Sequence, residues 1–276
     1  MTGASNEIFF RASGRNFFIK GLAGGGLILS GTLRDEDFAD IDAGRVNWSR
    51  TRSRIKAGNF GDPSRMAIAS IDVGYQGRPL SVAPRFRWGV FAGYTYWNEV
   101  SDGYGSLTQP LPDAAPKALA SVNAAMAAGG DDKDPFELSP PGIVELPGNL
   151  RVIRNNRIWH GPRLGIELAH PLTDSLTLKA EFAFLPALML HDRDSHFIDG
   201  GPMPSHLIDG WGIGTQSQVA LEWQALDNLK LGVGFRYWQA RMTSGSMRAP
   251  DERGKAPIDK YTSDRMGGFA ELTYAF

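Results

Sequence analysis

The sequence predicts an all-β protein, an antiparallel up-and-down β-barrel of the transmembrane type. Three observations predict this class. Segments that alternate apolar and polar side chains run through most of the chain, short and long connections alternate between them, and the chain ends on an aromatic residue, Phe276, within such a segment. Alternation with a period of two is typical of strands that have one apolar and one polar face.

Nine strand candidates follow from this alternation. The last one alternates Leu272 and Tyr274 with Glu271 and Thr273. Charged residues in the middle of other strands, such as Lys179, fit the polar lumen of a membrane barrel better than a water-soluble sandwich. The candidates lie near 7–12, 16–34, 63–78, 84–104, 151–170, 176–193, 210–226, 229–246 and 262–276.

The connections alternate in length. Residues 171–175 and 225–228 form tight turns, whereas 35–62, 105–148, 199–210 and 249–262 are long and polar. Short turns on one rim and long loops on the other are typical of the periplasmic and extracellular ends of an outer-membrane barrel. One window, 117–128, is Ala-rich and helix-like. Eight aromatic residues suit interfacial girdles: Trp88, Tyr94, Tyr96, Trp97, Trp211, Trp223, Tyr237 and Trp238.

Composition excludes several classes of protein. The formal net charge of -1 provides no basic field that would recruit nucleic acid. The absence of cysteine excludes disulfides and thiolate metal sites. No apolar stretch reaches the roughly 18 residues of a membrane-spanning helix, while a membrane β-strand needs only about 10 alternating residues.

The N-terminal end departs from this pattern. Bacterial barrels close with an even number of strands, whereas nine are visible, and no signal peptide precedes them. We therefore expect residues 1–276 to form a single outer-membrane β-barrel domain that is N-terminally truncated, without its signal peptide and first strand. The alternative is a strand count that is wrong by one.

Two acidic clusters end strands that climb to the long-loop rim. The strand from residue 16 ends in Asp-Glu-Asp-Phe at 35–38, and the strand from residue 176 ends in Asp-Arg-Asp-Ser-His-Phe at 192–197. The two strands are not adjacent, so the barrel allows the clusters to face each other across the lumen. A carboxylate beside an imidazole suits general-base catalysis, because the acid orients the ring and supports its charged form.

These residues resemble the omptin family, which comprises ten-stranded outer-membrane aspartate–histidine endopeptidases. Omptins carry Asp-x-Asp-aromatic at the top of an early strand and Asp-x-Asp-x-His-aromatic at the top of a later one, as 35–38 and 192–197 do here. The resemblance extends from about Phe17 to Phe276 and includes Phe-Ala-Gly-Tyr at 91–94, the order of long and short connections and the terminal strand.

The resemblance implies a role for each residue. Asp194 would orient His196, which would accept a proton from water, while Asp35 and Asp37 would hold that water from across the cleft. The water would attack the peptide carbonyl without an acyl-enzyme. Asp192 would bind a basic side chain of the substrate. The implied partners are a peptide or protein substrate and outer-membrane lipid, with lipopolysaccharide as an activating lipid and no other cofactor.

The chain departs from the family in two places. The family's other pocket acid lies on the first strand, which this chain lacks by our count. The 105–148 loop is also longer than we expect for the family. Lipopolysaccharide-binding residues can be proposed only by residue type, the candidates being Arg85, Arg87, Arg151, Arg154 and Arg157. We expect a monomer in the bacterial outer membrane with its active site facing outside.

The 176–193 strand contains a conflict of parity. Its even positions are apolar up to Phe184 and should face lipid, yet Asp192, Asp194 and His196 are also even and should face the lumen. A β-bulge adds one residue and shifts the facing of all that follow it, and a bulge tolerates proline. We therefore predict an irregularity near Pro186.

Alternative interpretations stay open. The 192–196 run resembles a solvated loop end, and its Asp-x-Asp spacing suits Ca²⁺, although no glycine turn and distal Glu follow. We expect no metal site. His160, His170, His191 and His206 fit surface positions better than ligand positions. The competing functions are a non-enzymatic barrel, such as an adhesin or a structural or porin-like protein, and a lipid-modifying barrel hydrolase.

Overall fold

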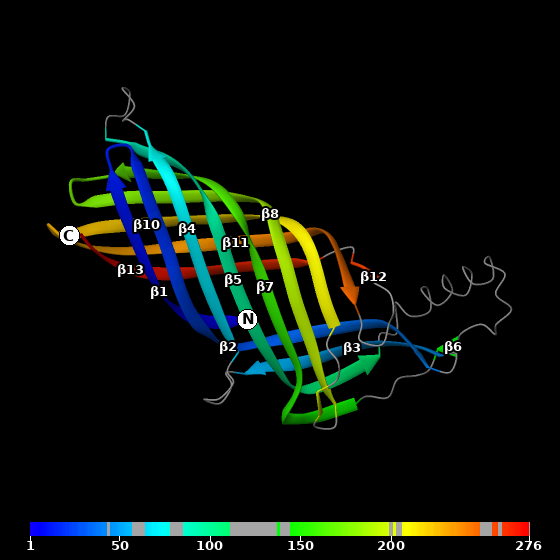
Figure 1. Cartoon of the computed structure of the whole chain (residues 1–276). Helices are drawn as coiled ribbons and strands as arrows, with labels where there is room; N and C mark the ends of the chain where they lie inside the picture. The colour runs from blue at the N-terminus through cyan, green and yellow to red at the C-terminus, as the bar shows by residue number, and fades with distance from the viewer. Residues whose placement is uncertain are drawn as a thin grey trace.

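The computed structural model is built of long β-strands (Figure 1). It describes residues 1–42, 45–56, 64–77, 85–110, 137–138, 144–198, 201–202, 206–248, 256–258 and 261–275. The strands are β1 (Thr2–Gly14), β2 (Phe17–Asp42), β3 (Arg45–Lys56), β4 (Arg65–Gln76), β5 (Arg87–Pro110), β6 (Glu137–Leu138), β7 (Val144–Pro171), β8 (Leu176–Ile198), β9 (Gly201–Pro202), β10 (His206–Leu226), β11 (Leu229–Arg248), β12 (Ala256–Pro257) and β13 (Thr262–Tyr274).

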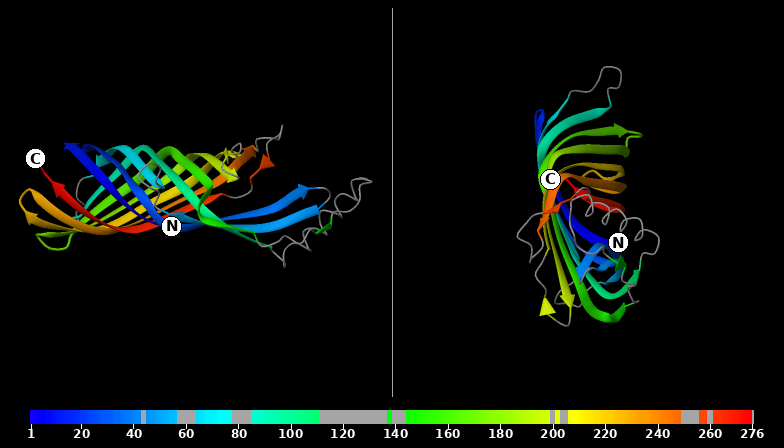
Figure 2. Two further views of the ribbon diagram at one scale, coloured as in Figure 1. Left: turned by 90° about the horizontal axis from the view of Figure 1, so that it is seen from below. Right: turned by 90° about the vertical axis from the view of Figure 1, so that its right-hand side faces the viewer.

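The long strands form one antiparallel up-and-down sheet. Each pairs with the next along the chain, in the order β1, β2, β4, β5, β7, β8, β10, β11, β13. Figure 2 shows from two further sides how this sheet curls. The predicted fold class, an antiparallel barrel, is therefore confirmed. In the described part of the chain, no helix is long and apolar enough to cross a bilayer.

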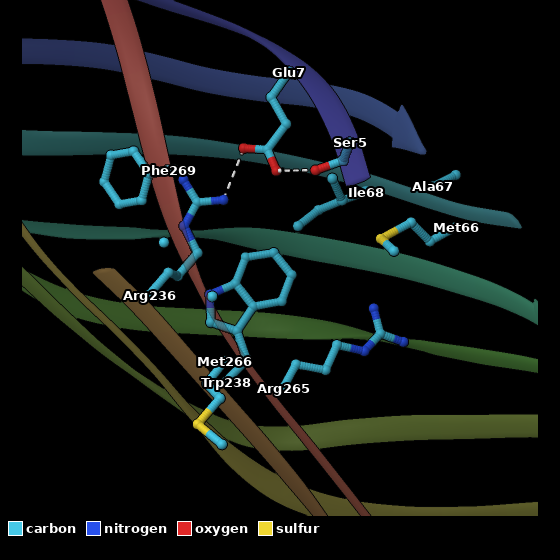
Figure 3. Close-up of a pocket in the computed structure, with 12 residues that line it drawn as sticks. Ser5, Glu7, Met66, Ala67, Ile68, Arg236, Trp238, Arg265, Met266 and Phe269 are labelled. Carbon is cyan, nitrogen blue, oxygen red and sulfur yellow. Dashed lines mark hydrogen bonds and ion pairs between the residues drawn. The ribbon is translucent and has the colours of Figure 1, made fainter. Parts of the chain in front are cut away.

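Side chains bridge the seam between the two edge strands, β1 and β13. Glu7 of β1 accepts a hydrogen bond from Arg236 of β11 at 2.7 Å and another from Ser5 at 3.3 Å (Figure 3). A pocket that is open to solvent lies beside this ion pair and is lined by residues of β1, β4, β11 and β13. Among the described residues, β1 pairs only with β2, and β13 only with β11.

The outer wall is apolar and exposed in the half of the barrel nearest the tight turns, which we call the lower barrel; the half that carries the acidic clusters is the upper barrel. Large contiguous apolar surfaces are unfavourable in water, so a belt of this kind fits the hydrocarbon layer of a membrane. The belt begins beside the tight turns and ends near Tyr96 on β5, Phe184 on β8 and Trp211 on β10. Its members include Val73, Val90, Leu164, Ile166, Leu168, Leu178, Phe182, Ile213, Val219, Leu221, Val233 and Phe235.

The lower lumen is filled by paired charges. The Lys20 ammonium, whose side chain is 4% exposed, lies 3.0 Å from a Glu167 oxygen and 2.6 Å from a Glu181 oxygen. Arg163 reaches the other Glu181 oxygen at 2.6 Å and lies 3.5 Å from Asp72. Buried charges are tolerated where opposite charges and hydrogen bonds satisfy them. The expected polar lumen is therefore present at this level.

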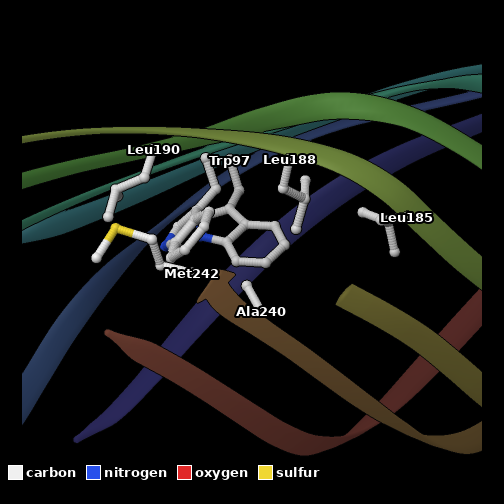
Figure 4. Close-up of a cluster of buried hydrophobic side chains, with 7 residues drawn as sticks. Trp97, Leu185, Leu188, Leu190, Ala240 and Met242 are labelled. Atoms are coloured by element: carbon white, nitrogen blue, oxygen red, sulfur yellow. The ribbon is translucent and has the colours of Figure 1, made fainter. Parts of the chain in front are cut away.

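Above these charges, an apolar layer fills the lumen (Figure 4). Trp97 of β5 and Trp159 of β7 are almost completely buried, with ring centroids 6.1 Å apart, and Trp238 of β11 stacks on Trp97 at 5.8 Å. Leu185, Leu188, Leu190, Ala240 and Met242 complete the layer. The assignment of Trp97 and Trp238 to an interfacial girdle is therefore wrong, because both rings pack inside the barrel.

The predicted long loop at 35–62 is largely β-structure. Strand β2 continues to Asp42, and β3 returns alongside it, with Glu36 opposite Arg50 in the register. The alternation rule misses this hairpin because its sequence is polar on both faces, so no apolar face marks the period. The helix-like window at 117–128 lies outside the described residues.

The predicted irregularity at Pro186 is confirmed. Strand β8 advances three residues, from Leu185 to Leu188, while β10 advances only two, from Gly214 to Gly212. The ladder with β7 shifts at the same place. Below the bulge the odd residues of β8 are buried, and above it the even residues are buried, as the contrast of Ala183 and Leu185 with Leu188, Leu190 and Asp192 shows.

Candidate active site

The two acidic clusters lie at the same end of the barrel. Strands β2 and β8 both start at tight turns and run in the same direction, so Asp35 and Asp37 on one strand and Asp194 and His196 on the other lie at the opposite rim. In the sheet, β3, β5 and β7 separate these two segments. This arrangement agrees with the predicted placement at the long-loop rim.

The side chains of Asp35, Asp37 and His196 lie outside the part of the chain that the structure describes. The backbone register nevertheless fixes the levels of the two clusters. Through β3, Asp35 is level with Thr108 of β5, and through β7, Asp194 is level with Ser101 of the same strand. Asp35 therefore lies seven residues farther along β5 than Asp194, toward the end of that strand.

Asp192 faces the lumen and is 4% exposed. Its Oδ2 accepts hydrogen bonds from the Tyr261 hydroxyl at 2.5 Å and from Asn155 Nδ2 at 3.1 Å, whereas its Oδ1 has no hydrogen-bond partner among the described residues. Burial raises the pKa of this carboxyl, and the nearby Arg157 opposes the shift. Asp192 lies above the apolar belt, beyond the part of the barrel that fits the hydrocarbon layer of a membrane.

Strand β7 supplies a guanidinium to this carboxylate. Arg157 donates from Nε to the Tyr261 hydroxyl at 2.5 Å, and its Nε lies 4.0 Å from Asp192 Oδ2. Its Nη1 lies 3.5 Å from Glu99, which also accepts a hydrogen bond from Arg265 at 2.5 Å. The aromatic ring of Tyr261 in turn packs against Trp159 of the apolar layer, at a centroid distance of 5.9 Å.

A second buried ion pair lies close by. Arg154 donates two hydrogen bonds to Asp102, at 2.7 and 2.8 Å, and Asp102 is completely buried. The backbone N–H of Asp102 donates to the Ser64 hydroxyl at 2.9 Å. Such bidentate geometry is the strongest form of an arginine–carboxylate contact. This pair ties β5 to β7 at the rim that carries the candidate site.

These positions rule out two of the five lipid-binding candidates and locate the other three. Arg154 and Arg157 point into the barrel and pair with buried acids. Arg85 and Arg87 lie at the tight-turn end, where Arg85 pairs with Asp174 of the neighbouring turn. The fifth candidate, Arg151, stacks over the Phe197 ring at 4.3 Å. Residue type alone misleads here because arginine serves both lumenal ion pairs and headgroup contacts.

The outer wall carries a row of histidines at the upper edge of the apolar belt. The His160 and His191 rings stack at 5.5 Å, Tyr94 hydrogen-bonds His160 at 2.5 Å, and His191 contacts Asp209 at 2.7 Å. These histidines therefore occupy surface positions, as expected. Within the described ranges, no three His, Asp or Glu side chains converge to hold a metal ion.

The chain was compared with known proteins. No protein-family model matches it, and no curated protein matches it significantly. Among solved structures, it superimposes on the outer membrane protease OmpT from Escherichia coli with a TM-score of 0.61. The fold is that of OmpT. The match covers 95% of this chain and 79% of OmpT, at 15% sequence identity.

The likeness to OmpT confirms the predicted resemblance at the level of the fold. The roles of Asp35, Asp37, Asp192, Asp194 and His196 stay predictions. Sequence reasoning did not identify the residues around Asp192, which come from β5, β7 and the start of β13, far apart in the chain: Glu99, Asn155, Arg157, Tyr261 and Arg265. No local motif marks them. The charged residues near the upper ends of several strands were a usable signal.

Proposed function

We propose that this protein is an outer-membrane endopeptidase that cleaves exposed peptides near basic residues, with its active site facing outside. One observation carries the proposal. The bulge at Pro186 shifts the alternation of inward and outward side chains by one residue in the upper part of β8. Asp192 therefore faces the lumen. Because side chains alternate along a strand, the sequence pattern predicts that Asp194 and His196 share the face of Asp192.

The proposed mechanism is direct attack of water on the peptide carbonyl. His196 accepts a proton from the water, whose oxygen forms a bond to the carbonyl carbon. The proton then passes to the amide nitrogen as the carbon–nitrogen bond breaks, and no covalent enzyme intermediate forms. Asp194 orients the imidazole and supports its charged form. Asp35 and Asp37 hold the attacking water from the β2 side.

Asp192 is the proposed binding residue for a basic side chain of the substrate. Its buried Oδ1 makes no hydrogen bond within the described part of the chain, which leaves an acceptor available for a substrate cation. Buried polar atoms are rarely left unsatisfied, because each costs stability. A lysine or arginine side chain entering from the rim would provide the missing donor.

The proposed setting is the outer membrane, with lipopolysaccharide as an activating lipid and the protein as a monomer. The exposed apolar belt supports a membrane setting, since its residues alternate with buried ones along the same strands. The upper strands continue past the belt, so the candidate site would stand above the lipid. Long strands such as β7 therefore separate the chemistry from the bilayer.

A non-enzymatic outer-membrane barrel is the second candidate. The β2–β3 hairpin favours it, because a projecting antiparallel ribbon can present a binding surface without any chemistry (Figure 1). The apolar layer around Trp97 and Trp159 argues against the porin-like form of this candidate, since side chains fill the lumen at that level. An adhesin or a structural barrel is therefore its more specific form.

The test is cleavage of fluorogenic peptides containing paired basic residues by protein refolded with lipopolysaccharide. His196→Ala should lower kcat/KM by roughly 10²- to 10⁴-fold, as expected for loss of a general base. The matched control is His191→Ala, on the outer wall of the same strand, which should cleave like the wild type. Equal activity of wild type and His196→Ala would sink the mechanism, and absence of cleavage in the wild type would favour the non-enzymatic barrel.

A further inference from the structure

The carboxylate proposed to receive a basic side chain already has a guanidinium beside it. Arg157 Nε lies 4.0 Å from Asp192 Oδ2, and the Tyr261 hydroxyl links the two by accepting from Arg157 and donating to Asp192, each at 2.5 Å. The Arg157 side chain is only 18% exposed. A charged group held this closely in a desolvated site interacts strongly with whatever else enters it.

The charges around Asp192 are balanced within the described cluster. Asp192 and Glu99 are the acids, and Arg157 and Arg265 are the bases that contact them. Glu99 is shared by both guanidinium groups, at 3.5 Å from Arg157 and 2.5 Å from Arg265. A substrate lysine or arginine would therefore be a third cation beside two carboxylates, and it would meet repulsion from Arg157.

Geometry also places Arg157 where it competes for Asp192. It approaches the carboxylate through Tyr261 and not through a direct bidentate contact, so the pair is weaker than that of Arg154 with Asp102. A basic side chain that displaces Arg157 leaves it with Glu99 as its remaining acidic partner. The site can thus admit a cation at the unpaired Oδ1, but only against the positive charge of Arg157, which already neutralises Asp192 from the Oδ2 side.

We infer that Arg157 is a selectivity-determining residue, an internal guanidinium that competes with basic substrate side chains for Asp192 and so weakens the preference of the site for them. The substrate part of this inference rests on the proposed function, whereas the competition for Asp192 does not. Tyr261 assists by holding Arg157 against the carboxylate. Removal of the Arg157 charge then opens the site to guanidinium compounds.

The binding experiment uses agmatine, a small guanidinium compound, with the full chain refolded in detergent micelles and observed by NMR titration. Arg157→Met should bind agmatine at least about 10-fold more tightly than the wild type. Arg157→Lys, which keeps the positive charge, should bind as weakly as the wild type. In the double variant Arg157→Met, Asp192→Asn, the gain should disappear. No gain in Arg157→Met, or a gain that survives loss of the Asp192 charge, would overturn the inference.

A second variant, Tyr261→Phe, keeps the inference testable if Arg157→Met does not fold. This variant keeps the ring that packs on Trp159 and removes only the hydroxyl between Arg157 and Asp192. It should bind agmatine more tightly than the wild type by a smaller factor, roughly 2- to 5-fold. A folded Tyr261→Phe protein, checked by gel mobility with and without heating, that shows no gain would count against the inference.

The peptide experiment tests the substrate part. Matched peptides that carry either arginine or glutamine before the cleaved bond are offered to the wild type and to Arg157→Met. The ratio of kcat/KM for arginine over glutamine should rise about 10-fold in the variant, and an unchanged ratio would refute this part. If the wild type cleaves neither peptide, the proposed function fails, while the agmatine titrations still decide whether Arg157 competes for Asp192.

Discussion

Deletion of Ala187 would test how the bulge in β8 orients the candidate site. Pro186 and Ala187 span the place where β8 carries one residue more than β7 and β10. Without that residue, the strand above the bulge must turn its opposite face to the lumen. Leu188 and Leu190, both completely buried, would then leave the apolar layer, and Asp192 would leave its hydrogen bonds.

The cost follows from the burial of the two leucines. Full burial of a leucine side chain contributes about 1.5–3 kcal/mol, so the loss of both predicts destabilisation by about 3–6 kcal/mol. The measurement is equilibrium unfolding by guanidinium chloride in detergent micelles, followed by tryptophan fluorescence. Ala187→Gly is the matched control, because it keeps the residue count and should stay within about 1 kcal/mol of the wild type.

Cysteine labelling would report the orientation itself, since the chain has no native cysteine. A cysteine in place of Arg193, which is exposed on the outer side of β8, should react rapidly with a soluble maleimide. In the deletion background, the same cysteine should turn inward and become protected. A deletion variant that keeps wild-type stability, with an equally reactive cysteine at 193, would refute the account of the bulge.

Three further predictions concern the lumen. Arg154→Ala should cost about 3–5 kcal/mol in guanidinium unfolding, because it leaves the buried Asp102 carboxylate unpaired; a loss below about 1 kcal/mol would contradict this, and Arg154→Lys should lose less. Trp159→Ala should cost about 3–5 kcal/mol, whereas Trp211→Ala on the exposed outer wall should cost far less, and equal losses would argue against a packed interior layer. Agmatine binding to Arg157→Met should weaken as the pH falls, with a midpoint above the ordinary aspartate pKa of 3.8, because burial raises the pKa of Asp192 and this variant removes the charge that lowers it. A midpoint at or below 3.8 in an NMR titration against pH would contradict a raised pKa of Asp192.

Much of the fold could be predicted from the sequence, because membrane barrels impose a simple rule. Each strand has one face toward lipid and one toward the lumen, so a period of two appears directly in the residues. The bulge at Pro186 was also predictable, since Phe184 and Asp192 both hold even positions but are expected on opposite faces of the strand. The rule fails for the β2–β3 hairpin, where both faces are polar, and for Trp97, where an aromatic residue faces inward.

The candidate site was only partly predictable, for a different reason. Asp35, Asp37, Asp194 and His196 stand out as two short local motifs. The environment of Asp192 has no such motif, because Arg157 and Tyr261 are brought together by the register of β7 and by the path of the chain into β13. Contacts between distant segments depend on shear and curvature of the sheet, which alternation alone does not determine.

The apolar layer around Trp97 and Trp159 has a consequence for how a chain could meet the candidate site. It makes the barrel a cup with a solid floor, not a tube. A polypeptide that enters at the rim with the candidate site must leave by the same rim, so it would lie across that rim as a bent or extended segment. Under the proposed function, a cup of this kind would cut internal stretches of exposed chains and release both pieces on the side from which they came.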